Sequence, residues 1–275
     1  MTAVTYPLDA GVDVPDTPAP TMRMRRAVED GAAVTGRNLR GYLRTPQLLV
    51  FSSIQPVIFV LLFRYVFGGA IRVPGVPYVD FLMPGIFAQT VVFGAMATAI
   101  GLSTDLHSGL LERFRSLPIA RSAALAGRTS ADLVRNVFVL VLMCAVGFAV
   151  GWRIHTDVVS FLGAMLLMLA FGYAMSWVFA TVGLVARDAE AAQALSFPVL
   201  APLIFASSAF VPVTSMPGWL QTFARNQPVS AVTTAVRELT LGGATTGHVL
   251  TAIAWCVGIV ALAAPFAVRR FRRAV

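Results

Sequence analysis

The sequence predicts an all-α, polytopic membrane protein with six transmembrane helices. Two observations support this fold class. Only 12% of the 275 residues are charged and 57% are hydrophobic, whereas a soluble domain carries about 25% charged residues. The apolar residues also gather in long runs, and about 20 consecutive apolar residues are enough to cross the hydrocarbon core of a bilayer. The composition is therefore that of a membrane protein.

The N-terminal part divides into two segments. Residues 1–21 are rich in proline and mildly acidic, which predicts a disordered tail ahead of a single transmembrane domain at 22–275. Residues 22–45 combine apolar side chains with basic ones, and this pattern predicts an interfacial helix that contacts lipid headgroups through Arg37, Arg40 and Arg44. An ordinary charged flank before the first span is the alternative.

Six apolar runs follow, and each is a candidate span: 48–68, 81–101, 133–151, 159–186, 195–213 and 248–267. The fourth is long enough that it must tilt or protrude. The fifth is the weakest, because three prolines interrupt its hydrogen bonding. We expect it to kink, or to enter the membrane and return.

The segment between the fifth and sixth runs is too polar to cross a membrane. It holds apolar residues at helical spacing on both sides of Pro228. This predicts two short helices within 214–240, broken at Pro228 and lying at the outer surface with an apolar face in the membrane. An anchored external loop and an outer lid over an exit path are both open as roles.

The placement of arginine predicts the orientation. All 21 basic residues are arginine. Fifteen fall on the side of the predicted spans that holds both termini, and four fall on the other side, at Arg72, Arg153, Arg225 and Arg237. Because basic residues stay on the cytoplasmic side, we expect a multi-pass protein of the plasma (inner) membrane with both termini in the cytoplasm. Membrane lipids explain the basic excess without a nucleic-acid partner.

Several kinds of chemistry find no support in the sequence. A P-loop needs a lysine, and the chain has none. We find no metal-ligand cluster and no hydrolase motif, so neither an enzyme nor a bound cofactor or metal is expected. Cys144 and Cys256 fall in apolar runs and are expected to be buried hydrophobes. The predicted spans lack Asp and Glu, which disfavours proton coupling.

Arg64 is the ionisable residue singled out within a predicted span. It lies near the outer end of the first run. We expect its side chain to extend to the outer interface, with contact to an anionic headgroup or substrate as the alternative.

The stretch "GLLERFRSLP" (109–118) predicts an amphipathic helix between the second and third spans. On a helix, its leucines and Phe114 share one face together with Leu106, while Glu112 and Arg115 occupy the other face and Pro118 ends the helix. Either the helix lies in the headgroup plane, or it docks a cytosolic partner that moves it.

Several stretches together resemble the membrane-spanning subunit of ABC-2-type exporters, in the branch of the daunorubicin/doxorubicin-resistance permeases. They are "RNLRGYLRTP" (37–46), "FGGAI" (67–71), "FLMPGIFAQT" (81–90), "DLHSGLLERFRSLPIARSAALAGRTSADLVRN" (105–136) and "MPGWLQTFARNQPVSAVTTAVRELTLGG" (216–243). The block at 105–136 is the most specific of these.

The resemblance implies a drug or antibiotic exporter built from two such permeases, identical or homologous, above two cytosolic ABC ATPase subunits that hold ATP and Mg²⁺. It also implies external re-entrant helices near 214–240 and a coupling helix that meets the ATPase through Asp105, Glu112, Arg113, Arg115 and Leu117. Export of a lipid or lipid-linked glycan, proton-coupled transport, and a non-transporting scaffold are the alternatives.

Overall fold

The computed structural model describes residues 46–71, 73–107, 121–243 and 245–274. All regular elements in these ranges are helical, and no strand occurs in them. In chain order they are α2 (Pro46–Leu61) with the π-helix η1 (Leu62–Phe67), α3 (Tyr78–His107), α5 (Arg121–Ala149), α6 (Val158–Val185), α7 (Ala189–Phe205), the 3-10 turn η2 (Val213–Ser215), α8 (Gly218–Arg225), α9 (Pro228–Leu241) and α10 (Thr245–Ala274).

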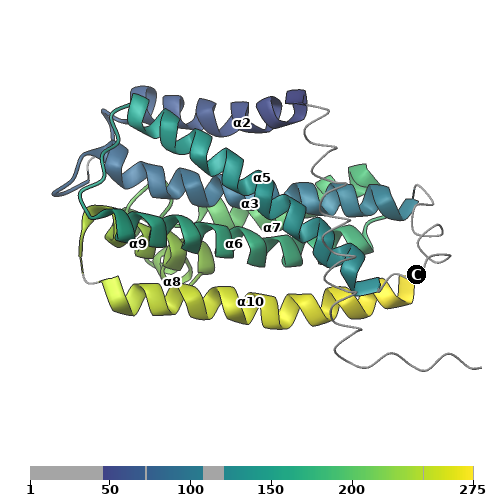
Figure 1. The fold of residues 1–275 in the computed structure, drawn as a ribbon. Helices are drawn as coiled ribbons and strands as arrows, with labels where there is room; N and C mark the ends of the chain where they lie inside the picture. Colours follow the sequence, from purple (N-terminus) through teal and green to yellow (C-terminus); the bar gives the residue numbers. More distant parts are fainter. Residues whose placement is uncertain (1–45, 72, 108–120, 244, 275) are drawn as a thin grey trace, which may run out of the picture.

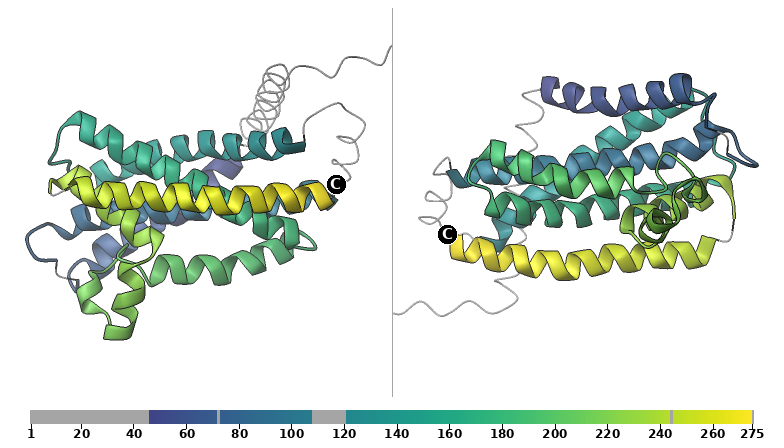
Figure 2. Two further views of the ribbon diagram at one scale, coloured as in Figure 1. Left: turned by 90° about the horizontal axis from the view of Figure 1, so that it is seen from below. Right: turned by 180° about the vertical axis from the view of Figure 1, so that it is seen from behind.

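The long helices lie side by side and run in alternating directions (Figure 1). α3 lies in the middle and contacts α2, α5, α6, α7 and α9, while α10 packs along α6 and α9. The last turns of α3, α6 and α10 lie near one end of the molecule together with the starts of α2, α5 and α7 (Figures 1 and 2). We call this the C-terminal end. The short helices α8 and α9 lie toward the opposite end, which we call the α9 end.

Four of the described helices are long and apolar enough to cross a membrane, within α3, α5, α6 and α10. The first and fifth predicted spans are shorter apolar helices. α7 has 17 residues, about 26 Å at 1.5 Å per residue, which is less than the roughly 30 Å of a hydrocarbon core. The all-helical membrane architecture is confirmed, whereas six full crossings stay a prediction.

Local chemistry sets where several of these helices begin and end. Asp157 caps α6 by accepting hydrogen bonds from the backbone amides of Val159 and Ser160, at 3.1 and 3.2 Å. Its carboxylate also accepts from the Ser160 hydroxyl at 2.7 Å. The hydroxyl and backbone hydrogen bonds from Ser160 hold the pKa of Asp157 below its usual range. At the other end of a helix, Gly242 follows α9 with φ +89°, a conformation that favours glycine.

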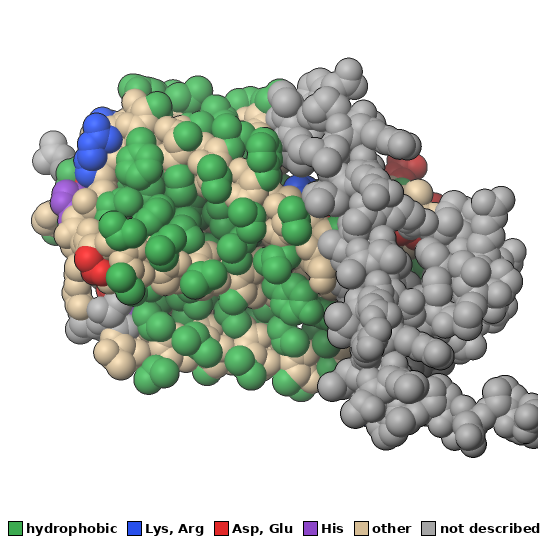
Figure 3. Space-filling model, viewed as in Figure 1, with side chains coloured by type: hydrophobic (Ala, Val, Ile, Leu, Met, Phe, Trp, Pro, Cys, Tyr) green, Lys and Arg blue, Asp and Glu red, His purple; other side chains and the backbone are tan. Residues whose placement is uncertain are grey.

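The lateral surface of the helices is apolar. α10 shows this most clearly, because Leu250, Val257 and Leu262 are more than half exposed. In Figure 3, hydrophobic side chains cover the middle of the visible face, whereas arginine and histidine side chains lie at its left edge and acidic side chains lie toward both its left and its right ends. An apolar belt with charges at its end suits a protein surrounded by lipid.

The segment predicted to be external forms two helices with the break at Pro228, as predicted, but only α8 leaves its large apolar side chains exposed. Trp219 and Phe223 of α8 are 78% and 46% exposed. The expectation that the second helix also lays an apolar face in the membrane is wrong. Val229, Val232 and Val236 are fully buried, because α9 packs against α3, α6 and α10.

Candidate functional site

The backbone between α7 and α8 turns back inside the protein. Pro212 follows α7 by a few residues, and Ser207, Ser208, Ala209 and Phe210 are all at least 95% buried. Backbone groups that leave a helix inside a membrane protein need other partners. This short segment, residues 206–211, is called the α7 turn below.

Side chains from α3 and α9 supply those partners. The Arg237 guanidinium of α9 donates to the carbonyl of Ser208, to the carbonyl of Ala209 at 3.1 Å, and to that of Phe81 at 2.8 Å. Gln227 Nε2 donates to the carbonyls at 203 and 206, at 3.0 and 3.2 Å. The Tyr78 hydroxyl donates to the Phe210 carbonyl at 3.0 Å. The α7 turn is thus held by hydrogen bonds on several sides.

Arg237, which the sequence places in a short helix at the outer surface, is a buried cation. Its side chain lies over the Phe81 ring, 3.5 Å from the centroid, and it is 9% exposed. Burial lowers its pKa to about 9, so it is still charged at neutral pH. An arginine can be buried in this way because its planar group donates to several carbonyls at once.

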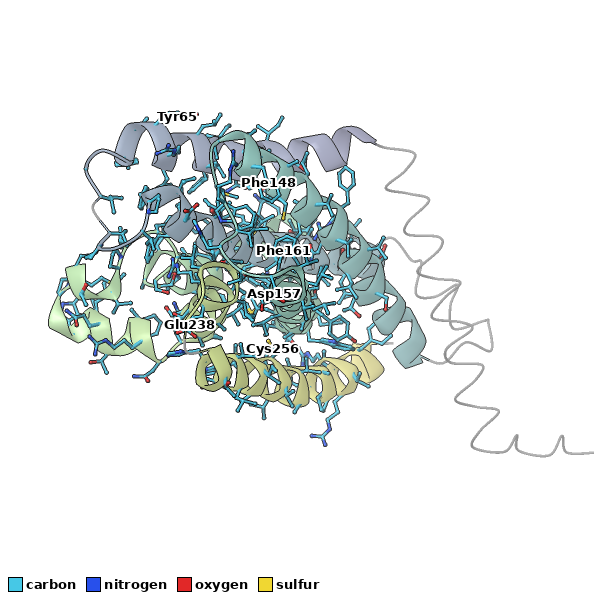
Figure 4. All side chains as sticks on the ribbon, turned by 60° about the vertical axis from the view of Figure 1, so that its left-hand side comes forward. Tyr65, Phe148, Asp157, Phe161, Glu238 and Cys256 are labelled. Atoms are coloured by element: carbon cyan, nitrogen blue, oxygen red, sulfur yellow. The ribbon has the colours of Figure 1, made fainter. Side chains whose placement is uncertain are left out.

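The helical segment of α2 and η1 contacts the same turn through an aromatic stack. Phe63 of η1 lies 4.5 Å from Phe210, centroid to centroid, with the rings nearly parallel at 5°. The neighbouring Arg64 is half-buried and its Nε donates weakly to the Val150 carbonyl at 3.4 Å. Tyr65, labelled in Figure 4, is 68% exposed, and the Arg64 guanidinium is 5.9 Å from its ring. Arg64 therefore lies at the α9 end, bound to backbone and an aromatic ring.

A second polar group lies deep between α3 and α5. Arg135 and Asn136 of α5 are 7% and 3% exposed. An Arg135 terminal nitrogen, Nη2, donates to the Gly94 carbonyl of α3 and to Asn136 Oδ1, the latter at 3.3 Å. Both residues fall inside the run predicted as the third span. Neither residue was predicted as a site residue, although an arginine in an apolar run is a signal for a functional site.

These residues line a cavity between α2, α3 and α5 of about 180 Å³. Its polar lining includes Gln55, Gln89, Thr90, Arg135 and Asn136, and the Gly94 backbone contributes as well. Three buried atoms of this lining, Gln89 Oε1, Arg135 Nε and Asn136 Nδ2, have no hydrogen-bond partner in the described part of the chain.

Two carboxylates that the sequence places outside the spans lie inside the helices. Asp132 of α5 is fully buried and accepts a hydrogen bond from the Thr98 hydroxyl. Asp80 of α3 is 2% exposed and accepts from the Arg153 amide and from His155 Nε2, both at 3.0 Å. The expectation of spans without acids is therefore wrong, because α3 and α5 begin before their apolar runs.

The remaining predicted site residues are not brought together. Asp105 lies in the last turns of α3, half-buried, at the C-terminal end, and so at the opposite end from Arg64. Most of the predicted coupling helix and all of the predicted interfacial helix lie outside the described residues: Arg37, Arg40, Arg44, Glu112, Arg113, Arg115 and Leu117.

The two cysteines and Glu238 lie at separate places in the fold. Cys256, labelled in Figure 4, is buried on α10, and Cys144 is half-buried on α5. Glu238, also labelled there, pairs with His248 of α10 at 2.7 Å. No group of three or more possible metal ligands occurs among the residues that the structure describes.

Comparison with known proteins finds similarity along most of the chain. A profile of the ABC-2 type transporter family matches residues 31–241. The chain is 36% identical to the daunorubicin resistance ABC transporter permease protein DrrB1 of Streptomyces coeruleorubidus, over 91% of the chain and 89% of that protein. It is 28% identical to the probable doxorubicin resistance ABC transporter permease protein DrrC of Mycobacterium tuberculosis, over 87% of each.

Proposed function

This chain belongs to the ABC-2 type transporter family, and on that premise we propose that it is the permease subunit of an ATP-driven exporter of lipophilic or amphipathic drugs. One observation supports this above all. The likeness to a daunorubicin resistance permease extends over 91% of the chain, so it includes the central helices and the α7 turn as well as the surface.

The energy source is proposed to be a separate subunit. The chain holds no lysine, and a P-loop needs one to reach the β- and γ-phosphates of ATP. Permeases of this family work with an ABC ATPase, which would bind ATP and Mg²⁺. A second permease, identical or homologous, would complete the transporter.

We propose that the ATPase binds at the C-terminal end of the molecule. α3 ends at His107 and α5 begins at Arg121, and both positions lie near that end (Figure 1). The stretch 109–118, for which the sequence predicts an amphipathic helix, lies between them in the chain, and its charged residues are proposed to meet the ATPase there. In this arrangement both chain termini are cytoplasmic, as the arginine distribution predicts.

Transport into inside-out vesicles tests the proposal. The chain is co-expressed with its ABC ATPase, and daunorubicin uptake is followed by its fluorescence after ATP is added. We expect ATP-dependent uptake that is lost when the ATPase lacks its P-loop lysine. Uptake driven by a pH gradient without ATP, or no uptake beside an active ATPase, would contradict the proposal. Movement of a labelled lipid in place of the drug would favour lipid export.

A further inference from the structure

We propose that α3 and α5 move as one unit when the ATPase acts on the permease, and that Thr98 of α3 is a positioning residue that holds the two helices together. The inference rests on the proposed function, because it concerns how force from the ATPase enters the membrane helices. It is carried by two buried polar contacts that join α3 to α5.

The first argument is the alignment of these contacts. The Thr98 hydroxyl donates to the Asp132 carboxylate of α5, and Arg135 Nη2 donates to the Gly94 carbonyl of α3. The two α3 residues are one helical turn apart, and the two α5 residues are nearly one turn apart. The contacts therefore follow one another along the line where the helices meet. Both lie within the segments that are long and apolar enough to cross a membrane.

The second argument is the effect of breaking the contacts. Thr98 and Asp132 are fully buried, and Arg135 is 7% exposed. If α3 moved away from α5, a carboxylate and a guanidinium would lose these partners among apolar side chains, where bulk water does not replace them. Removing one partner of a buried charged group is strongly unfavourable. A displacement that keeps α3 and α5 together avoids this loss.

The third argument is the contrast with α6, the other long helix that packs along α3. α6 carries no charged side chain. A Cβ at Gly183 of α6 would lie 2.4 Å from the Ala99 carbonyl oxygen of α3, and a Cβ at Gly172 would lie 3.1 Å from the Val91 Cβ. Because small and apolar residues form these contacts, a shift along them leaves no charged group without a partner. α3 is therefore expected to shift against α6 more easily than it separates from α5.

The fourth argument is the position of the contacts along the helices. α3 ends at His107 and α5 begins at Arg121, near the C-terminal end where the ATPase is proposed to bind (Figure 1). Thr98 lies about 14 Å before the end of α3 at 1.5 Å per residue, whereas the whole helix is about 45 Å long. Force applied between the two helices thus reaches the contact with α5 well before it reaches the α9 end.

Thr98→Val tests the inference, because it removes the hydroxyl donor and keeps the shape of the side chain. The variant is co-expressed with its ABC ATPase, and daunorubicin uptake and ATP hydrolysis are both measured in inside-out vesicles. We expect the daunorubicin taken up per ATP hydrolysed to fall by about 3- to 10-fold, the size of effect that one hydrogen bond between membrane helices supports. Uptake per ATP equal to that of the native protein would overturn the inference.

Two further variants separate this role from plain packing. Thr104→Val removes an exposed hydroxyl of α3 that donates to the Ile100 carbonyl of the same helix at 2.9 Å, and it should leave the uptake per ATP unchanged. Thr98→Ser keeps a donor for Asp132 and should restore most of the native value. A residue needed only for folding would lower the amount of transporter without changing the uptake per ATP. That result, or a serine variant as poor as the valine variant, would overturn the inference.

Distances between spin labels give a second test that does not depend on the valine variant. In a chain carrying Cys144→Ala and Cys256→Ala, labels are attached at Thr104→Cys of α3 and at either Val134→Cys of α5 or Leu166→Cys of α6, all at exposed positions. The labelled chain is diluted with unlabelled chain and assembled with its ATPase. When ATP is trapped, we expect the α3–α5 distance to stay constant while the α3–α6 distance changes.

The outcomes of the two experiments distinguish this inference from the proposed function. A changed α3–α5 distance, or no change in either distance, would overturn the inference while ATP-dependent export by the native protein still stands. Absence of ATP-dependent uptake by the native protein beside an active ATPase would refute the proposed function and this inference together.

Discussion

Replacing Arg237 by methionine should weaken the attachment of the α7 turn to α9. The change leaves the buried carbonyls of Ser208 and Ala209 without their donor, while the methionine still covers part of the Phe81 ring. Each carbonyl left without a donor costs about 1–3 kcal/mol, and relief from burying a guanidinium offsets part of the sum. We therefore expect a loss of about 2–4 kcal/mol. For a chain of this size that is a fall in the unfolding midpoint of about 4–16 °C.

Thermal unfolding of the purified, full-length protein in detergent measures this loss. The unfolding midpoint is the temperature at which half of the monodisperse species has disappeared from the size-exclusion profile. Arg225→Met is the matched control, because Arg225 is exposed on α8 and donates only to Gln221, at 3.2 Å. It should cost less than about 0.5 kcal/mol. Arg237→Lys should fall between the two, since one ammonium cannot reach carbonyls on two segments. Equal midpoints for the two methionine variants would refute the reasoning.

Three further predictions concern packing, coupling and pH. A Cβ at Gly85 would lie 1.9 Å from the Ala209 carbonyl oxygen. Gly85→Ala should therefore lower stability by about 1–3 kcal/mol in the same unfolding assay. At Gly258 no atom lies within 4 Å of an added Cβ, so Gly258→Ala should not lower stability. Glu112→Arg combined with Arg115→Glu should reduce stimulation of the partner ATPase by about tenfold in vesicles, and unchanged stimulation would remove these residues from the docking surface. Because the pKa of Asp157 is lowered on folding, its carboxylate stabilises the protein at neutral pH, and this contribution disappears as the pH falls below about 4. If the unfolding midpoint fell equally with acid in the native protein and in Asp157→Asn, this reasoning would be contradicted.

Hydropathy and proline placement predict the helices better than they predict what surrounds each helix. The apolar runs coincide with helices because lipid and a protein core both select apolar side chains. For the same reason, hydropathy alone does not tell whether an apolar side chain faces lipid or the protein core. Val232 and Leu250 have similar hydropathy, yet the first is fully buried under α3, α6 and α10 while the second is 61% exposed. Only the packing of distant segments decides which is which.

The candidate site likewise contains residues that the sequence alone could identify and residues that it could not. Arg135 stands in an apolar run and could have been recognised from the sequence alone. Arg237 could not, because its neighbours resemble a surface helix and its acceptors, at 81, 208 and 209, are distant in the chain. The burial of Asp132 could not be predicted either. α5 begins at Arg121, well before the apolar run, so Asp132 lies inside a packed helix rather than ahead of it.

The ring stack between Phe63 and Phe210 has a mechanical consequence. Phe63 belongs to η1, whereas Phe210 belongs to the α7 turn, more than a hundred residues later in the chain. The Phe210 carbonyl also accepts a hydrogen bond from the Tyr78 hydroxyl. Any sideways displacement of η1 must either drag that tethered segment along or separate the rings, at about 0.5–1.5 kcal/mol beyond the lost contact area. The α9 end is thereby stiffened against bending, and we expect rearrangement during a transport cycle to concentrate toward the opposite, C-terminal end.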